Sequence, residues 1–167
     1  MSVDLTADGA GYVLTRGEGA ASWFLDTRMT IKAGAEQTHG AFTFIEWQAP
    51  AGFGPPRHIH DLDDEAFYVL DGSMNLECGE STLEAGPGDF VLLPRGVAHA
   101  FVVTSDVIRG LQVTAPSGFE QLVAAVGRAP EHDGLPRPSM PDIEAVAAAS
   151  AAVGARIVGP PMAAPVT

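Results

Sequence analysis

Short apolar runs separated by turn-forming residues occupy the first two thirds of the chain. Between residues 12 and 113, β-branched and aromatic residues cluster in runs broken by Gly, Pro and Asp, which is typical of many short antiparallel strands. The side chains alternate between two faces over residues 41–48 and 65–70, and Asp71-Gly72 then supplies the two-residue sequence most typical of a hairpin. Further strands are expected at residues 73–78, 89–93, 98–104 and 107–114. The pattern predicts an all-β sandwich or barrel.

The spacing of apolar residues changes to a helical period after Pro116. Apolar side chains follow one another at i, i+3, i+4 and i+7: Phe119, Leu122, Val123 and Val126. Ser117 and Glu120 have the spacing of an S-x-x-E capping box, which predicts a helix of about three turns. A second helix is expected from Pro141 to Gly154. One of its sides would carry Ile143, Val146, Ala147 and Val153.

Composition and charge narrow the possible partners. The 167 residues include nine Lys and Arg against twenty-one Asp and Glu, a formal charge of −12 with Lys32 as the single lysine, so no nucleic-acid partner is expected. Residues 1–10 hold Asp4 and Asp8 and no apolar stretch suited to a signal peptide, and no run approaches ~18 apolar residues. The single Cys78 cannot form an internal disulfide. We therefore expect a cytoplasmic protein that does not enter a membrane.

Four residues have the spacing of a metal site. His58 and His60 stand at i and i+2 on an extended segment, so their side chains point to the same face. A hairpin-like return through residues 61–64 would bring Glu65 onto the neighbouring strand, where its carboxylate becomes a third ligand. His99, at the start of another expected strand, offers a fourth. Scattered surface or core histidines remain the alternative interpretation.

The two runs that contain these residues resemble the paired motifs of the cupin superfamily. The first motif, G-x5-H-x-H-x4-E-x6-G, is met by Gly52, His58, His60, Glu65 and Gly72. The second, G-x5-P-x-G-x2-H-x3-N, is met by Gly88, Pro94, Gly96 and His99, with Val103 in place of the usual Asn. The resemblance implies a cupin jelly-roll β-barrel with the metal inside its mouth and two short helices after the barrel. One structural domain would then comprise N-terminal strands in residues 1–40, a barrel core with the metal site in 41–115, a helical extension in 116–159 and a flexible tail in 160–167.

The ligand set indicates one divalent transition metal without identifying it. Three imidazoles and one carboxylate suit Fe, Ni, Co, Mn, Cu or Zn, and no thiolate is present to favour a purely structural zinc. Four protein ligands around a six-coordinate ion leave two positions for water, substrate or dioxygen, which favours catalysis. A structural metal remains the alternative.

Alternation along the strands also identifies candidate substrate-pocket residues. They are Phe67 and Val69 on the face of Glu65, Phe101 and Val103 on the face of His99, and Phe53 just before the first ligands. Phe42 and Phe44, or else Ile45 and Trp47, would add aromatic surface, since the sequence leaves open which of these faces points inward. A pair of Phe residues at this spacing is more often ordinary core.

Among cupins, the chain resembles the single-domain quercetin-dioxygenase-like proteins. That resemblance implies that Glu65 is both ligand and general base, and that the substrate is a small apolar enolisable or phenolic molecule, with dioxygen as a candidate co-substrate. A non-redox isomerase, decarboxylase or cyclase, or a non-catalytic small-molecule-binding cupin, are the alternatives. A homodimer is also expected, because Tyr68, Leu70, Val102 and Ile108 are predicted to face outward.

Overall fold

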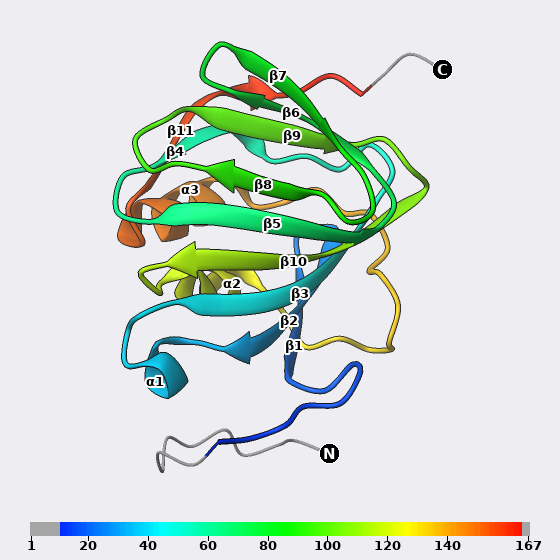
Figure 1. Cartoon of the computed structure of the whole chain (residues 1–167), viewed down its shortest axis with the longest axis vertical. Coiled ribbons are helices and arrows are strands. Elements are labelled where there is room, and N and C mark those ends of the chain that lie inside the picture. The colour runs from blue at the N-terminus through cyan, green and yellow to red at the C-terminus, as the bar shows by residue number, and fades with distance from the viewer. Residues whose placement is uncertain (1–10, 165–167) are drawn as a thin grey trace.

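The computed structural model describes residues 11–164, which form two antiparallel β-sheets facing each other (Figure 1). The six-stranded sheet has, in spatial order, β1 (Ala20–Phe24), β2 (Thr27–Ala33), β3 (Thr43–Pro50), β10 (Val107–Ala115), β5 (Asp64–Asp71) and β8 (Phe90–Leu93). The five-stranded sheet has β11 (Ala155–Pro161), β4 (Pro56–His60), β9 (His99–Val103), β6 (Met74–Cys78) and β7 (Ser81–Ala85). Three helices accompany the sheets: α1 (Ala35–Thr38), α2 (Phe119–Val126) and α3 (Ile143–Ala152). The all-β jelly roll expected from the sequence is confirmed.

The chain passes repeatedly from one sheet to the other. One such passage is at Asp71-Gly72, where the sequence predicted a hairpin. The preceding strand β5 pairs with β10 and β8, whereas the following strand β6 pairs with β7 and β9 in the other sheet. The turn is therefore a crossover and not a hairpin. Gly72 has φ +80°, and an added Cβ would lie 2.4 Å from the Val107 carbonyl oxygen. Only glycine fits this tight crossing.

The core lies between the inward faces of the sheets. On β3, Ile45 and Trp47 are buried whereas Phe44 is half-buried, and Phe42 just before the strand is exposed, so the inward face is the one that carries Trp47. The Trp47 ring lies 5.4 Å from the Phe67 ring of β5 and 5.7 Å from the Phe101 ring of β9. The second of these tilted contacts joins the two sheets, since β9 belongs to the five-stranded sheet.

The helix α2 contains the four predicted apolar residues, but with eight residues it is shorter than three turns and it begins differently. Its N-cap is Gly118, without a side-chain cap, so the predicted Ser117–Glu120 capping box is wrong. The Glu120 carboxylate instead accepts hydrogen bonds from the backbone N–H of Ala35 and Gly118 and from the Thr43 hydroxyl. Because it ties α2 to residues far away in sequence, this contact could not be predicted from local spacing.

The helix α3 is shorter and more exposed than the sequence suggested. It begins after Asp142, whose carboxylate accepts a hydrogen bond from the backbone N–H of Ala145 at 3.0 Å. Ile143, expected on a packed side, is 68% exposed. The chain then forms β11, which pairs with β4 and extends to Pro161, into the segment expected as a loose tail. The expectations for residues 1–10 and for 165–167 lie outside the described residues.

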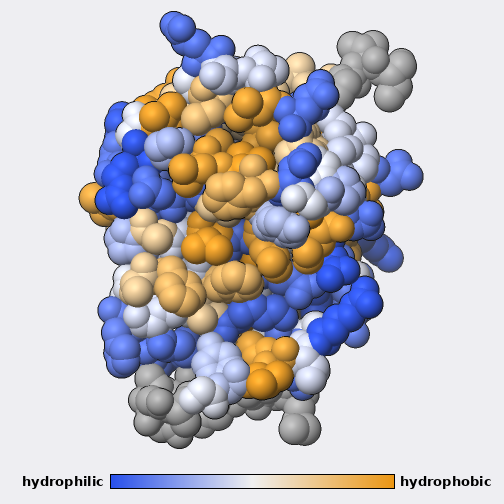
Figure 2. Space-filling view, in the orientation of Figure 1, coloured by the Kyte–Doolittle hydropathy of each residue, from blue (hydrophilic) through white to orange (hydrophobic). Residues whose placement is uncertain are grey.

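Apolar side chains gather on the outside of the six-stranded sheet, over β5 and β8 (Figure 2). Phe90 is 65% exposed, and Leu92 and Tyr68 are also exposed. Val102 and Ile108, predicted to face outward with Tyr68 and Leu70, are in fact buried. Ile108 belongs to the main hydrophobic cluster because β10 turns that face toward the interior. In the described part of the chain, no helix is both long and apolar enough to cross a bilayer.

Candidate metal centre

Three imidazoles and one carboxylate meet where the two sheets face each other. His58 and His60 lie on β4, His99 begins β9 and Glu65 lies on β5; one potential ligand atom from each lies within 4.8 Å of the others. His58 pairs directly with His99 across β4 and β9. The expected hairpin-like return beside β4 is wrong, because β5 belongs to the opposite sheet. The cluster therefore connects the two sheets.

Each histidine uses its Nδ1 to contact an oxygen acceptor. His58 Nδ1 lies 2.7 Å from the Pro56 carbonyl oxygen, and His99 Nδ1 lies 2.9 Å from the Val97 carbonyl oxygen. His60 Nδ1 lies 2.8 Å from an oxygen of the buried Asp63 carboxylate. Since a carbonyl oxygen only accepts, Nδ1 of His58 and His99 carries the proton and Nε2 presents its lone pair. This is the usual arrangement of metal-binding imidazoles.

The unsatisfied polar atoms of the cluster fit a cation. His99 is completely buried, and its Nε2 makes no hydrogen bond to any residue among 11–164. This nitrogen lies 3.3 Å from Glu65 Oε2, close but without hydrogen-bond geometry. A buried, unpaired lone pair facing a carboxylate is unfavourable unless something positive lies between them. The donor set therefore fits a divalent transition metal.

The protonation states of His58 and Glu65 favour ligand behaviour. Burial lowers the pKa of His58 to about 4, so this imidazole is neutral near pH 7. Burial would raise the pKa of Glu65, but the neighbouring imidazoles of His99, His60 and His58 outweigh that effect and lower its pKa to about 2. A neutral imidazole and an ionised carboxylate are the forms that bind metals. His60 differs: burial would lower its pKa, but the hydrogen bond to Asp63 and the nearby carboxylates raise it, so a metal would have to displace a more firmly held proton there.

Gln112 is a member of the site that sequence analysis missed. Its side-chain N–H donates to Glu65 Oε1 at 2.5 Å and holds the carboxylate in place. Gln112 is buried on β10, between the inward-facing Gly110 and Thr114. A polar residue at an inward position of a strand was the available signal.

The three acidic residues after His60 are Asp61, Asp63 and Asp64, and each binds a different partner. Asp63 is buried against His60, as above. Asp64 accepts from the Arg95 guanidinium at 2.9 Å, and Asp61 accepts from the Arg156 guanidinium of β11 at 2.6 Å. Each carboxylate thus has its own partner, and the turn that bears the His60 acceptor is fixed on both sides.

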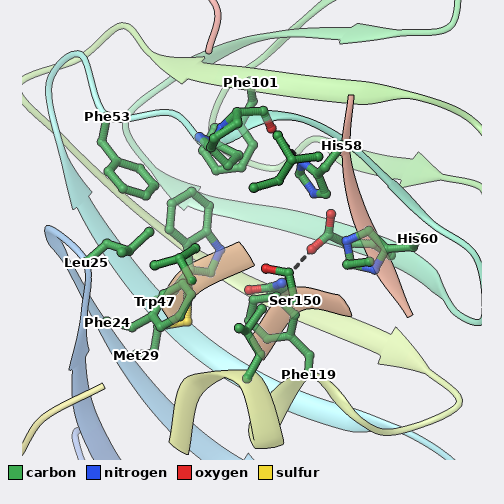
Figure 3. Close-up of a pocket in the computed structure, with 18 of the residues that line it drawn as sticks. Phe24, Leu25, Met29, Trp47, Phe53, His58, His60, Phe101, Phe119 and Ser150 are labelled. Carbon is green, nitrogen blue, oxygen red and sulfur yellow. Dashed lines mark hydrogen bonds between the residues drawn. The ribbon is translucent and has the colours of Figure 1, made fainter. Parts of the chain in front are cut away.

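A largely apolar pocket extends from the cluster (Figure 3). Its aromatic lining consists of Phe24, Trp47, Phe53, Phe67, Phe101 and Phe119. Phe53 and Trp47 lie away from the histidines, whereas His58 and His60 lie at the opposite end. Val69 and Val103, also predicted as pocket residues, do not line it. They are buried in the main hydrophobic cluster, because each lies four residues beyond a ligand and therefore deeper in the barrel.

Comparison with known proteins identifies the family. A model of the cupin domain matches residues 45–109 of this chain. This segment contains His58, His60, Glu65 and His99, and it coincides with strands β3 to β9 of the jelly roll. This chain is a cupin.

Curated relatives of this cupin include two quercetin 2,3-dioxygenases. The one from Bacillus subtilis (strain 168) is 31% identical over 121 residues, covering 72% of this chain and 36% of the relative. The one from Aspergillus japonicus is 33% identical over 94 residues, covering 52% of this chain and 27% of the relative. The cupin thus spans only about a third of the length of these proteins.

Solved structures share the fold. The polyketide cyclase RemF from Streptomyces resistomycificus is 25% identical with a TM-score of 0.56, covering 65% of this cupin and 81% of RemF. KdgF from Halomonas sp. has a TM-score of 0.58 at 17% identity, covering 66% of this cupin and 98% of KdgF. The second likeness concerns the fold alone.

Proposed function

We propose that this cupin is a metal-dependent oxidoreductase of the dioxygenase type that acts on a small, largely apolar molecule with an enolisable or phenolic hydroxyl. The observation that carries the proposal is the position of four metal-ligating side chains, His58, His60, Glu65 and His99, at one end of an aromatic pocket. The sequence similarity to quercetin 2,3-dioxygenases, whose name specifies a polyphenol and dioxygen chemistry, supports the same reaction class.

The residues of the chain have separate tasks in this proposal. A divalent transition metal would supply redox chemistry and the Lewis acidity that lowers the pKa of a substrate hydroxyl toward the range in which Glu65 accepts its proton. Glu65 Oε2 is the accepting atom, since Oε1 is occupied by the Gln112 amide. The rings of Trp47 and Phe101 orient a planar substrate and exclude water.

The charges around the pocket favour a neutral substrate. Among the described residues that line it, Arg156 is the one arginine or lysine, and both its Nε and its NH2 group are bound to the Asp61 carboxylate. Apart from the proposed metal, no arginine or lysine of the described lining is therefore free to pair with a carboxylate or phosphate of a substrate. This favours a phenol or enol over a dicarboxylic acid.

Dioxygen uptake by metal-loaded protein tests the reaction. A panel of flavonols, simple phenols and 1,3-diketones should include a substrate that consumes oxygen only when the metal is present. Glu65→Gln should keep most of the metal and lose most of the turnover, because the amide oxygen can still accept from Gln112 but the side chain no longer takes a proton. Equal turnover in the variant would exclude the proton transfer.

A non-redox reaction is the second candidate. The similarity to the polyketide cyclase RemF favours cyclisation among such reactions, which include isomerisation and decarboxylation. The same metal and pocket would activate an enolate without oxygen. Product formation with no oxygen uptake would replace the dioxygenase proposal with this one, and saturable binding without any product would indicate a binding protein.

We also propose that the cupin forms a homodimer through the outer face of β5 and β8. Exposed Phe90 and Leu92 make this face apolar, and an apolar face of this kind on a soluble domain is commonly covered by a second subunit. Analytical ultracentrifugation should show the mass of two chains. A monomer at micromolar concentration would contradict the dimer.

A further inference from the structure

The helix α3 turns a single buried side chain toward the rest of the molecule, and that side chain is polar. Of its ten residues, Ser150 alone is buried, with 7% of its surface exposed. Ser150 lines the pocket beside Phe119 (Figure 3). Neighbouring residues of α3 that approach the interior, Val146 and Ala149, are apolar and only half buried.

The Ser150 hydroxyl has no partner in the part of the chain that the structure describes. It makes no hydrogen bond, including the common one to the backbone carbonyl four residues earlier. The hydroxyl oxygen is not among the fully enclosed unpaired polar atoms of the described residues, so it reaches the open space of the pocket. Six of the ten residues of α3 are alanines, and alanine at position 150 would favour the helix. Packing and helix stability therefore do not account for a serine here.

We propose that Ser150 is a specificity-determining residue whose hydroxyl hydrogen-bonds to a second, neutral oxygen of the substrate. The inference rests on the proposed function in one respect, that the first oxygen of the substrate is directed to the metal centre. Ser150 lies beside Phe119, whose ring stacks on the His60 ring with the centroids 6.5 Å apart, so the second oxygen would bind on the same side of the pocket as the metal ligands. Ser150 comes from an element beyond the segment matched by the cupin-domain model.

The second oxygen belongs to a hydroxyl or a carbonyl. The Ser150 hydroxyl can donate and accept, so it can bind either group. A carboxylate at this point would need a cation, and the Arg156 guanidinium at the pocket is already held by Asp61. The chemical class is therefore a planar aromatic molecule with at least one neutral oxygen for α3 in addition to the oxygen or adjacent oxygens that bind at the metal end.

A ligand series tests this assignment by calorimetry on the metal-loaded protein. The probes are 3-hydroxyflavone, whose hydroxyl and adjacent ketone would both bind at the metal end, and derivatives with one added ring hydroxyl each. Wild-type protein should bind at least one derivative more tightly than 3-hydroxyflavone. Ser150→Ala should weaken that derivative about 3- to 10-fold, as expected for one lost neutral hydrogen bond, and leave 3-hydroxyflavone unchanged. Ser150→Thr, which keeps the hydroxyl, should retain part of the preference.

The control is Ala147→Ser, which adds a hydroxyl on the exposed side of the same helix and should not alter the affinity for any probe. The melting temperature of ligand-free Ser150→Ala should equal or exceed that of the wild type. A lower melting temperature, an equal loss for all probes, no loss for any probe, or no binding by the wild type would each overturn the role of Ser150. Binding with the predicted pattern but without oxygen uptake would support Ser150 and contradict only the dioxygenase proposal.

Discussion

Two walls of the pocket are built from different parts of the chain. At the metal end, His58, His60 and His99 come from paired strands, and each Nδ1 lies at hydrogen-bond distance from an oxygen. In the other wall, α3 is mostly exposed and packs mainly on α2 and β11. The metal end lies within the segment that matches the cupin model, whereas the α3 wall lies outside it.

This contrast assigns metal binding to the strands and substrate contact to α3. A metal centre needs ligands in a fixed geometry, which paired strands supply better than an exposed helix. A substrate wall can vary without disturbing the metal, because Ser150 does not contact any ligand side chain through a hydrogen bond. Variants at the metal end should therefore change metal binding, and variants in α3 should change only ligand binding or local stability.

The largest effect is expected from His99→Ala. This variant removes a ligand that is completely buried. We expect metal affinity to fall at least about 100-fold, beyond the roughly 10- to 100-fold that loss of a ligand's hydrogen-bond partner costs. Metal content per folded protein and competition with a chelating dye would measure this. His39→Asn is the control, since His39 is exposed and its left-handed backbone, φ 51°, suits asparagine. Unchanged metal affinity in His99→Ala would contradict the proposed four-ligand site.

An intermediate effect is expected from Asp63→Ala. The variant leaves the four ligand side chains intact but removes the carboxylate that orients the His60 ring. Metal affinity should fall about 10- to 100-fold. Asp61→Ala is the matched control, because it removes an acid from the same turn that binds Arg156 at the surface instead of a ligand. Equal losses in both variants would mean that the net charge of the turn matters and that the orientation of His60 does not.

The sequence predicted which four side chains come together at the metal end, although the metal itself stays a prediction. Two histidines at i and i+2 share a face on any strand, so the placement of His58 and His60 follows from local geometry. The positions of Glu65 and His99 relative to them needed the resemblance to the cupin motifs, because strands in different sheets meet only in the folded molecule. For the same reason the Asp71-Gly72 turn was located correctly while its strand pairing was wrong.

The α3 wall was poorly predictable for a physical reason. The apolar spacing favoured a packed side with Ile143, but an alanine-rich helix has nearly the same apolar pattern on every side. Its orientation is set by contacts with α2 and β11. The strand β11 was itself hard to predict, because it contains Pro160 and Pro161 and proline is found mainly in strands at the edge of a sheet. Apart from Glu144 in the first turn, Ser150 is the one polar residue of α3, and it marks the side that faces the pocket.

The smallest effect is expected from Asp142→Ala. This variant also tests most directly whether the metal end is independent of α3. Asp142 caps α3 by accepting from the Ala145 backbone N–H, and loss of such a cap costs about 1 kcal/mol of helix stability. Hydrogen exchange should become several-fold faster in the amides of α3 and stay unchanged in β4 and β9, with metal affinity as in the wild type. Glu144→Gln, in the same first turn but without a cap bond, should have a weaker effect. Faster exchange in β4 or β9 would show that the metal end depends on α3, through β11, which contacts α3 and pairs with β4.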